Sequence, residues 1–327
     1  MIAHRPQSDP VHTGRPASIT IVGSYNVGLF LKGGRLPREG ETVIAEAFTE
    51  GGGGKGSNQA IAARRLGGDV RLIARLGDDK YGHEALQMYG REKLPLDTIL
   101  LDPTNHSGIS VILIDDAGRN MISVAPGANA GLSPEDLDRF ADTLTGSGIV
   151  GFQLENDRET VFYGLRKARE LGATTFLDPA PACPLPDDLL PCIDLIKPNE
   201  TEASILTGIE VCDAASAERA GRWLVDRGVG RAIVTLGAGG AVVVPPASDV
   251  ARHFPAPRVT AIDSTGAGDV FAGALLTCIA SGQRVDRAVA YANAAAALST
   301  TVVGVIEAIP APADVQTLLQ PETEAVR

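Results

Sequence analysis

Residues 261–274, AIDSTGAGDVFAGA, combine a turn of small residues with a carboxylate. Gly266, Ala267 and Gly268 lead into Asp269, after which apolar residues recur at helical spacing. A tight turn that opens a helix leaves backbone N–H groups free to bind an anion such as a phosphate. A carboxylate beside a transferring phosphoryl group suits a base that takes the proton of an attacking hydroxyl. The alternative interpretation is a glycine-rich turn in which Asp269 only favours the helix dipole.

Residues 51–56, GGGGKG, form a second glycine-rich stretch, which lies between a β-rich segment and a predicted helix. They satisfy the dinucleotide pattern GxGxxG, but five glycines in six residues match almost any glycine pattern. They are not a P-loop, because Gly56 follows Lys55 where Ser or Thr is required. We interpret the run as a hinge that closes on a small ligand, with Lys55 either at the ligand or in solvent.

Polar groups follow two other predicted strands. Asn199 and Glu202 have the spacing of a capping box at a helix start, which is a sufficient structural explanation. The same pair could organise a hydrated Mg²⁺ through its water ligands. Glu155 ends the segment QLE after an apolar strand, at the sheet edge where ligands collect in α/β proteins. The alternative for Glu155 is an exposed polar strand end.

Composition limits the classes of function. The chain has 327 residues, 44% of them hydrophobic, which is enough for one large domain with an appendage. A formal net charge of −11 argues against nucleic acid or an anionic membrane as the main partner. The four cysteines lack C-x-x-C spacing, which favours reduced, mostly buried thiols in a cytoplasmic protein. Residues 1–17 lack an apolar signal segment, and we expect a disordered tail there.

Short apolar runs alternate with helical periodicity along most of the chain. This alternation predicts an α/β fold, a doubly wound and mostly parallel sheet with helices on both faces. Four β-rich segments predict a small separate sheet that forms a lid over the ligand, within about residues 27–50 and 108–126. The expected strands of this sheet are residues 27–31, 42–48, 110–114 and 120–125. We expect the α/β domain to span residues 18–315 and a C-terminal tail to span residues 316–327. The expected core strands are residues 18–23, 70–76, 149–153, 174–177, 193–196, 232–236 and 241–244, and the expected helices are residues 58–66, 81–93, 134–144, 159–171, 200–206 and 214–227, with two more starting near residues 269 and 284.

Eight short segments follow one another along the chain, and they are GSYN (23–26), GGKGSN (53–58), ANAGLSP (128–134), QLE (153–155), DPAPA (178–182), KPNETE (197–202), TLG (235–237) and DSTGAGD (263–269). In this order they resemble the ribokinase family of carbohydrate kinases, also called PfkB-type, and the last segment is the most specific signature of the family. The resemblance extends from about residue 19 to about residue 309 and implies a ribokinase-like fold. It also implies transfer of the γ-phosphoryl group of ATP to a sugar hydroxymethyl group.

The resemblance also implies a role for each matching residue. Asp269 would be the base, and the N–H groups of Gly266, Ala267 and Gly268 would form an anion hole for the phosphoryl oxygens. Mg²⁺ and a monovalent cation, usually K⁺, would be required, and the lid would make a homodimer interface. Ala308 departs from the family, which often supplies a hydroxyl to the cation site at this position. The other implied contacts are Asn26, Gly54, Lys55, Asn58, Glu155 and position 28 for the sugar; Asn199, Thr235, Gly237, Gly240, Gly268 and Asn293 for ATP; Asn199 and Glu202 for Mg²⁺; and Asp263, Thr265, Ser299, Val302 and Gly304 for K⁺.

Gly28 is the informative departure on the sugar side. It stands where ribokinases carry an aspartate that accepts hydrogen bonds from two vicinal hydroxyls, and such charge-assisted bonds are strong. We hypothesise that Gly28 leaves room for a bulkier sugar or removes the demand for that diol, so that another sugar, a sugar acid or a nucleoside is the substrate.

Two other classes of function stay open. A nicotinamide-dependent dehydrogenase would rest on residues 51–56, but it leaves Asp269 without a role. A catalytically silent sugar sensor would explain Gly28, but it has no need of Asp269 and its anion hole.

Overall fold

The computed structural model describes residues 17–246 and 249–320. The expected N-terminal tail lies outside this part of the chain except for Ala17, and residues 321–327 of the expected C-terminal tail also lie outside it.

The larger sheet confirms the predicted α/β class. Within the described ranges it has nine strands in the order β13-β12-β11-β10-β9-β8-β1-β4-β5. All neighbours from β11 to β5 are parallel, whereas β12 and β13 are antiparallel additions at one edge. The strands are β1 (Ile19–Val22), β4 (Val70–Gly77), β5 (Ile99–Asp102), β8 (Ile149–Phe152), β9 (Thr174–Leu177), β10 (Leu195–Ile196), β11 (Arg231–Thr235), β12 (Ala241–Val244) and β13 (Arg252–Phe254).

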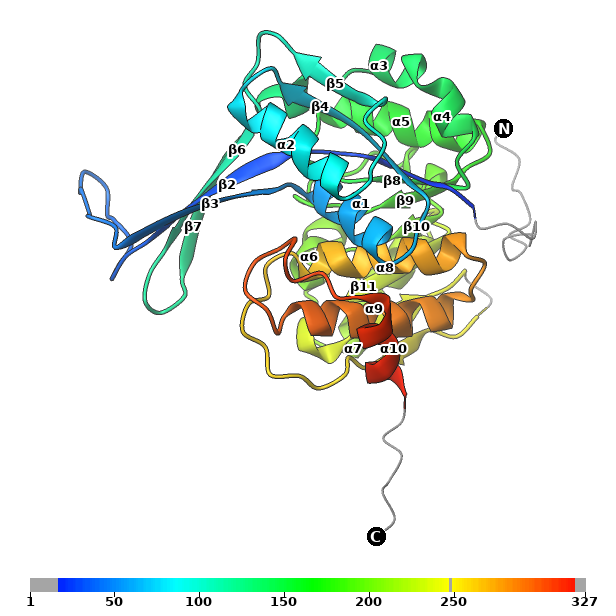
Figure 1. The fold of residues 1–327 in the computed structure, drawn as a ribbon. Coiled ribbons are helices and arrows are strands. Elements are labelled where there is room, and N and C mark those ends of the chain that lie inside the picture. The colour runs from blue at the N-terminus through cyan, green and yellow to red at the C-terminus, as the bar shows by residue number, and fades with distance from the viewer. Residues whose placement is uncertain (1–16, 247–248, 321–327) are drawn as a thin grey trace.

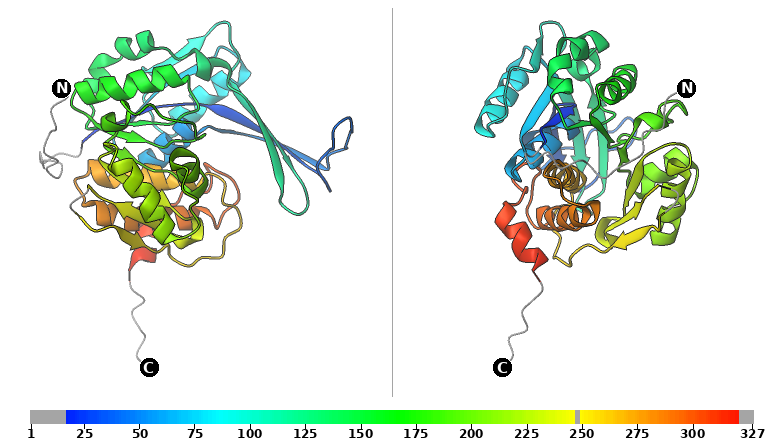
Figure 2. Two further views of the ribbon diagram at one scale, coloured as in Figure 1. Left: turned by 180° about the vertical axis from the view of Figure 1, so that it is seen from behind. Right: turned by 90° about the vertical axis from the view of Figure 1, so that its right-hand side faces the viewer.

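Helices cover both faces of this sheet (Figures 1 and 2). The alternation along β1 shows why, since Ile19 and Ile21 pack into one hydrophobic core and Val22 packs into the other. The first core contains α1 (Lys55–Arg65), α2 (Lys80–Arg91), α8 (Ala267–Ala280), α9 (Val285–Ser299) and α10 (Pro312–Leu319). The second contains α3 (Pro134–Arg139), α4 (Ala141–Thr145), α5 (Arg158–Glu170), α6 (Glu200–Thr207) and α7 (Ala214–Val225).

The helix expected to start near residue 284 is α9, and most of its residues from Ala288 to Ser299 are buried. None of the helices in the described segments is long and apolar enough to cross a membrane.

The smaller sheet projects from the body as an arm, which we call the lid (Figures 1 and 2). In the described part it has the strand order β3-β2-β6-β7, with a parallel pair at its centre and antiparallel strands at both edges. We call the face that carries Asn26, Gly28 and Phe30 the inner face, and the face that carries Val27 and Phe48 the outer face. The strands are β2 (Asn26–Lys32), β3 (Ala47–Gly53), β6 (Gly108–Ile114) and β7 (Asn120–Ala125).

The structure differs from the predictions where glycine or a short element is involved. The strand expected at residues 42–48 is wrong, because β3 begins at Ala47 and includes the glycines 51–53, which pair with residues 26–28 of β2. The helix expected at residues 134–144 is divided at Phe140, whose φ of −103° and ψ of 23° are not helical. The short elements β5, β13 and α10 were not predicted, and α10 continues past residue 315 because Val315 is buried in the core.

Candidate active site

The turn before α8 has the geometry of an anion site. Gly266 is left-handed at φ 76°, and a methyl group there would lie 2.5 Å from a side-chain carbon of Val305, so glycine is required. The N–H of Ala267 donates to the carbonyl of Ser264 at 3.2 Å. The N–H groups of Gly266 and Gly268 have no hydrogen bond within the described residues, and Gly268 is exposed. These two N–H groups are therefore available to an anion at the helix N-terminus.

The carboxylate of Asp269 lies behind this turn and is 5% exposed. Its Oδ2 accepts a hydrogen bond from Nδ2 of Asn58 at 2.8 Å, and its Oδ1 accepts one from Nε2 of Gln59 at 3.2 Å. The ammonium of Lys55 is 3.9 Å from Oδ1. Donors from the first turns of α1 thus satisfy a buried carboxylate that α8 supplies.

Gln59 was not predicted as a site residue. Its amide nitrogen donates to both Asp269 and Asp178, the latter at 2.8 Å, while its carbonyl accepts from the amide of Gln153 at 2.7 Å. Only a nitrogen can bond two carboxylates, so this network fixes the orientation of the amide. Helical spacing was the available signal, because Lys55, Asn58 and Gln59 stand at i, i+3 and i+4 and share one helix face.

A buried ion pair continues the network. Nζ of Lys197 lies 3.1 Å from Oδ1 of Asp178, with side-chain exposures of 4% and 1%, and it donates to the carbonyl of Gly268 at 3.3 Å. Lys197 therefore connects Asp178 to the turn that would hold the phosphoryl group. Burial, and then the charge of Asp178, raises the pKa of Glu202 on the neighbouring helix.

The sugar-side residues converge on Glu155. Its Oε2 accepts hydrogen bonds from Oγ of Ser24 at 2.5 Å, Nδ2 of Asn26 at 3.2 Å and the backbone N of Lys55 at 3.0 Å. Burial raises the pKa of Glu155 above its ordinary value, against the opposing effect of the Lys55 ammonium. The exposed-strand-end alternative for Glu155 is thus wrong, because the carboxylate is held inside the molecule by three donors.

Two further features of the sugar side are visible. Oδ1 of Asn58 is buried and has no hydrogen-bond partner among the described residues, so it can accept from a ligand hydroxyl. Gly54 has φ 94°, and a methyl group there would lie 2.7 Å from the backbone N of Asn26, so only glycine allows β2 and the start of α1 to approach so closely.

The space beside Gly28 bears on the hypothesis about the size of the sugar. A methyl group on Gly28 would lie 2.6 Å and 2.9 Å from two ring carbons of Phe30, so the aromatic ring already occupies that position. The end of the Phe30 side chain thus takes up the space beside Gly28, and the hypothesis that Gly28 leaves room for a bulkier sugar stays a prediction.

The predicted nucleotide residues gather at the carboxyl end of β11. Thr235 ends this strand, and its N–H donates to the carbonyl of Pro198 at 2.9 Å. Gly237 (φ 49°) and Gly240 (φ 91°) form the turn that follows. The amide of Asn293 donates to the carbonyl of Phe254 at 2.9 Å, the same oxygen that leaves no space for a side chain on Gly240.

Asn199 and Glu202 form the reciprocal capping box that their spacing predicted. The side chain of each accepts a hydrogen bond from the backbone N–H of the other, both at 2.8 Å. One carboxylate oxygen of Glu202 is used in this cap. The other is not used there, which leaves an acceptor for a water ligand of Mg²⁺.

The predicted K⁺ residues join two loops. Oδ1 of Asp263 accepts from the N–H of Thr265 at 2.9 Å, and Oδ2 accepts from the N–H of Gly304 at 3.1 Å. Ser299 donates its hydroxyl to the carbonyl of Ala296 at 2.8 Å, and Val302 is 45% exposed in the adjacent turn. Over the residues described, no group of three His, Cys, Asp or Glu side chains is placed to hold a metal ion.

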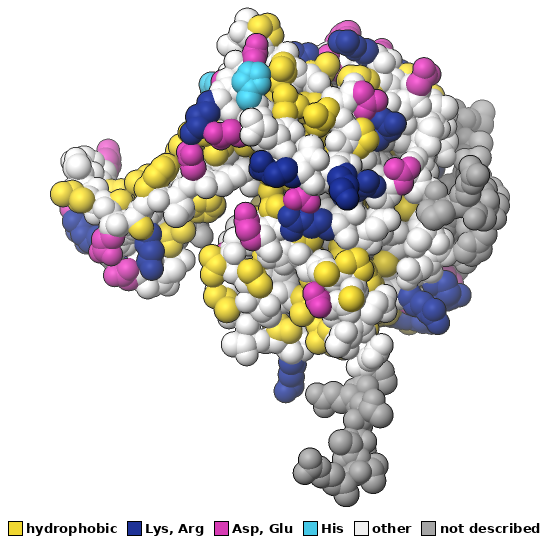
Figure 3. Space-filling view, in the orientation of Figure 1, with side chains coloured by type: hydrophobic (Ala, Val, Ile, Leu, Met, Phe, Trp, Pro, Cys, Tyr) yellow, Lys and Arg dark blue, Asp and Glu magenta, His cyan; other side chains and the backbone are white. Residues whose placement is uncertain are grey.

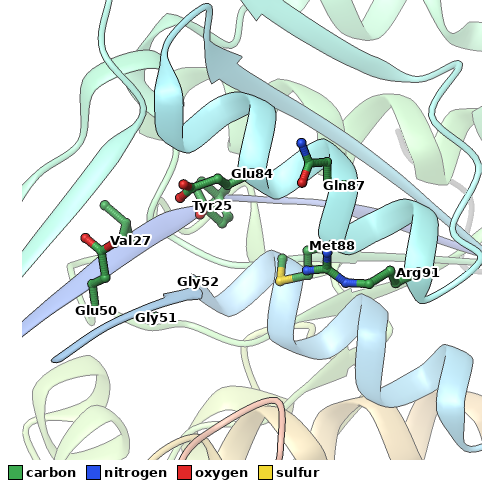
Figure 4. A pocket seen from close by; sticks show the side chains of 9 residues that line it. All are labelled: Tyr25, Val27, Glu50, Gly51, Gly52, Glu84, Gln87, Met88 and Arg91. Atoms are coloured by element: carbon green, nitrogen blue, oxygen red, sulfur yellow. The ribbon is translucent and has the colours of Figure 1, made fainter.

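A cavity of about 240 Å³ lies at the base of the lid, between β3 and α2 (Figure 4). Its lining includes Val27 and Glu50 from the outer face, together with Glu84 and Met88 from α2. Asp269 is not among the lining residues, so this cavity is separate from the candidate active site.

Comparisons with known proteins identify the family of the chain. The sequence matches the pfkB family carbohydrate kinase over residues 16–312. It is 37% identical over 295 residues to the deoxyribokinase of Salmonella typhi, covering 89% of this chain and 95% of that protein. It is 35% identical over 294 residues to the ribokinase of Haemophilus influenzae, covering 90% and 95%. The ribokinase of Arabidopsis thaliana, solved with ribose and ATP, superimposes with a TM-score of 0.86 at 29% identity, covering 94% of this chain and 99% of that one.

Proposed function

The chain belongs to the pfkB family of carbohydrate kinases and is an ATP-dependent sugar kinase, and from this premise we propose the residues that carry out the transfer. Asp269 is the base, and the free N–H groups of Gly266 and Gly268 bind the phosphoryl oxygens. The N–H of Ala267 joins them only as a donor shared with the Ser264 carbonyl. The observation that carries the proposal is the position of one buried carboxylate, held by donors from α1, directly behind a turn with free N–H groups.

In the proposed mechanism Asp269 accepts the proton of the sugar hydroxyl as that oxygen attacks the γ-phosphorus in line. Lys55, beside Oδ1, balances the charge of the carboxylate before the proton arrives. The turn at residues 266–268 and the helix dipole of α8 stabilise negative charge on the phosphoryl oxygens. Lys197 holds the Gly268 carbonyl and so keeps this turn in place.

Both cations fit residues of this chain. Glu202 and Asn199 would hold Mg²⁺ through its water ligands, and the bound ion would neutralise phosphate charge. The carboxylate of Asp263, which joins the loops at Thr265 and Gly304, would hold K⁺ with nearby backbone carbonyls, including those of Ser299 and Val302. The nucleotide would lie over Thr235, Gly237, Gly240 and Asn293.

We propose a pentose as the acceptor, with ribose and deoxyribose as the candidates. The relatives named deoxyribokinase and ribokinase support this class, and Asn26, Glu155 and Asn58 supply polar groups of the size that a monosaccharide needs. Another sugar, a sugar acid or a nucleoside is compatible with the fold but has no specific support. A dehydrogenase is not supported, because residues 51–53 pair in a strand rather than forming a phosphate-binding turn. The intact base and anion turn likewise argue against a silent sensor.

The test is release of ADP from MgATP, with and without K⁺, over pentoses, hexoses, sugar acids, polyols and nucleosides. Strong turnover with a pentose is the expected result, and stimulation by K⁺ is expected from the Asp263 site. Turnover confined to a compound of another class would overturn the pentose assignment.

We further propose a cytoplasmic homodimer that pairs through the lid. Large apolar side chains on the outer face support the dimer, since Phe48 is 58% and Met121 is 52% exposed in the single chain. The cytoplasmic location is supported by four free cysteines, of which Cys183, Cys192 and Cys278 are buried and Cys212 is exposed.

A further inference from the structure

We propose that the ring of Phe30, which lies over Gly28, makes this kinase select a deoxypentose over ribose. The inference rests on the proposed function, because it concerns the acceptor side of the same site. Its starting observation is that two ring carbons of Phe30 lie 2.6 Å and 2.9 Å from the position where a side chain on Gly28 would begin.

The register of the lid places this ring beside the sugar. Asn26, Gly28 and Phe30 alternate along β2 and share the inner face. Asn26 reaches Glu155, which in turn accepts from the backbone of Lys55, so the inner face begins at the sugar-side cluster. Gly28 is two residues further out, about 7 Å along the strand, within the span of a pentose.

The surroundings of Gly28 on the inner face are mostly apolar. The residues directly opposite it are Gly51 on β3 and Ser110 on β6. In the next row Phe30 lies between Ile112 on β6 and Thr49 on β3, and Ile112 is itself opposite Ile122. Gly28 thus shares its row with Gly51, Ser110 and Val124 among the described strands, and Ser110 is the one polar side chain in this row. Ser110 lies on β6, the strand next to Gly28.

This surface discriminates between sugars because the phenyl ring cannot form a full hydrogen bond with a hydroxyl group. A sugar hydroxyl that turns toward the phenyl ring loses its water without gaining an acceptor, and an unpaired buried hydroxyl costs free energy. A CH₂ group at the same carbon instead gains apolar contact with the ring. A purely apolar wall rejects an added hydroxyl by only about 10- to 100-fold, so we expect a preference of that size and not an absolute one.

The polar end of the site sets which part of the sugar meets Phe30. Asp269 and the anion turn must face the hydroxyl that is phosphorylated. The unpartnered Oδ1 of Asn58 and the carboxylate of Glu155 are the acceptors available to the hydroxyls next to it. The part of the ring that remains extends along the lid toward Gly28. A pentose that lacks a hydroxyl on that side fits this arrangement, and 2-deoxy-D-ribose is the probe.

The experiment compares kcat/KM for 2-deoxy-D-ribose and D-ribose in the wild type and in Phe30 variants. The wild type is expected to favour the deoxy sugar by about 10- to 100-fold. Phe30→Ala is expected to lower that ratio at least about fivefold, and Phe30→Leu, which keeps an apolar wall, is expected to keep most of it. Gly28→Asp combined with Phe30→Ala, which removes the ring that blocks position 28, is expected to favour ribose.

Matched controls separate contact with the sugar from damage to the lid. Phe48→Ala removes an aromatic ring from the outer face and is expected to leave the ratio unchanged. A ratio that falls in Ser110→Ala but not in Phe30→Ala would overturn the proposal. So would a wild type that prefers ribose, although the pentose kinase assignment would then stand. Turnover of neither pentose would instead overturn that assignment, and this inference with it.

Discussion

At the scale of single residues, the site is a network of buried charged and polar groups in which each group restricts the orientation of its neighbours. Gln59 donates to two carboxylates, and Lys197 joins one of them to the carbonyl of Gly268. Ionised groups are tolerated in the interior only when they are paired and hydrogen-bonded. The base and the anion turn are therefore held in place by side chains that need not touch the substrate.

Asp269→Asn tests the role of the base. The amide is nearly the same size as the carboxylate but cannot accept the proton, so we expect kcat to fall by roughly 10²- to 10⁴-fold. We measure ADP release at saturating sugar and ATP, with the thermal unfolding midpoint as the check on folding. Near wild-type kcat in a folded variant would remove Asp269 from this role.

Gln59→Ala tests the bridge between the carboxylates. Each buried polar group left without its partner costs about 1–3 kcal/mol, so we expect the free energy of unfolding to fall by more than about 2 kcal/mol. We also expect kcat to fall more than the sugar KM changes, since Gln59 orients the base. The control is Gln283→Ala on the surface, where a change within about 0.5 kcal/mol is expected. Equal effects of the two substitutions would contradict the bridging role.

At the scale of elements, α1 and the lid contribute the residues that we propose bind the sugar. The first turns of α1 bring Lys55, Asn58 and Gln59 to Asp269, while β2 brings Asn26 to Glu155. Gly54 is the single residue between β3 and α1, so β3 of the lid continues directly into α1, whose side chains donate to Asp269. A movement of the lid is thereby coupled to the site.

Gly54→Ala tests this connection. A left-handed backbone costs an alanine roughly 1–2 kcal/mol, and the 2.7 Å approach to the backbone N of Asn26 adds about 1–3 kcal/mol of crowding. The matched control is Gly67→Ala, at φ 100° with no atom within 4 Å of the new methyl group. Denaturant unfolding is expected to show a larger loss for Gly54, together with a raised sugar KM that Gly67→Ala does not show.

Closure of the lid is the second prediction at this scale. Every residue of β7 is exposed, as are the first five residues of β3. Without sugar, few contacts therefore protect the backbone amides of these edge strands from exchange with solvent. We expect a bound pentose to slow amide hydrogen exchange in β3 and β7 and to reduce proteolysis near residues 51–54. Exchange and cleavage that are the same with and without sugar would count against closure.

At the scale of the whole molecule, the distribution of side chains on the surface bears on the proposed dimer. Figure 3 shows hydrophobic side chains along the projecting lid, with acidic and basic side chains toward its tip, while the body carries charged and hydrophobic side chains interspersed. A net charge of −11 disfavours non-specific association, so an apolar patch is left to direct specific pairing.

Phe48→Asp tests the dimer. Sedimentation is expected to show a wild-type dimer of the 33.9 kDa chain and a largely monomeric variant, because a carboxylate on the outer face would be buried unpaired at the interface. Ile44→Asp is the control, since Ile44 is 89% exposed and lies outside the strands of the lid. A wild type that sediments as a monomer at all concentrations would refute the dimer.

The sequence by itself determined the fold class, the family and the turn with its following Asp269, because these depend on local periodicity and on short contiguous segments. It also predicted the capping box of Asn199 and Glu202, which is a contact within one helix turn. It misplaced β3, because a run of glycines carries no side-chain pattern and only pairing with β2 makes it a strand.

Only the tertiary structure decided what surrounds these residues. Gln59 reaches Asp178 and Asp269 across 119 and 210 positions of the chain, and no local pattern reports such a contact. The sequence showed that Gly28 lacks a side chain, but the fold of β2 decided that the ring of Phe30 fills the space. Local propensities are set by neighbours along the chain, whereas the shape and polarity of a binding site are set by neighbours in space.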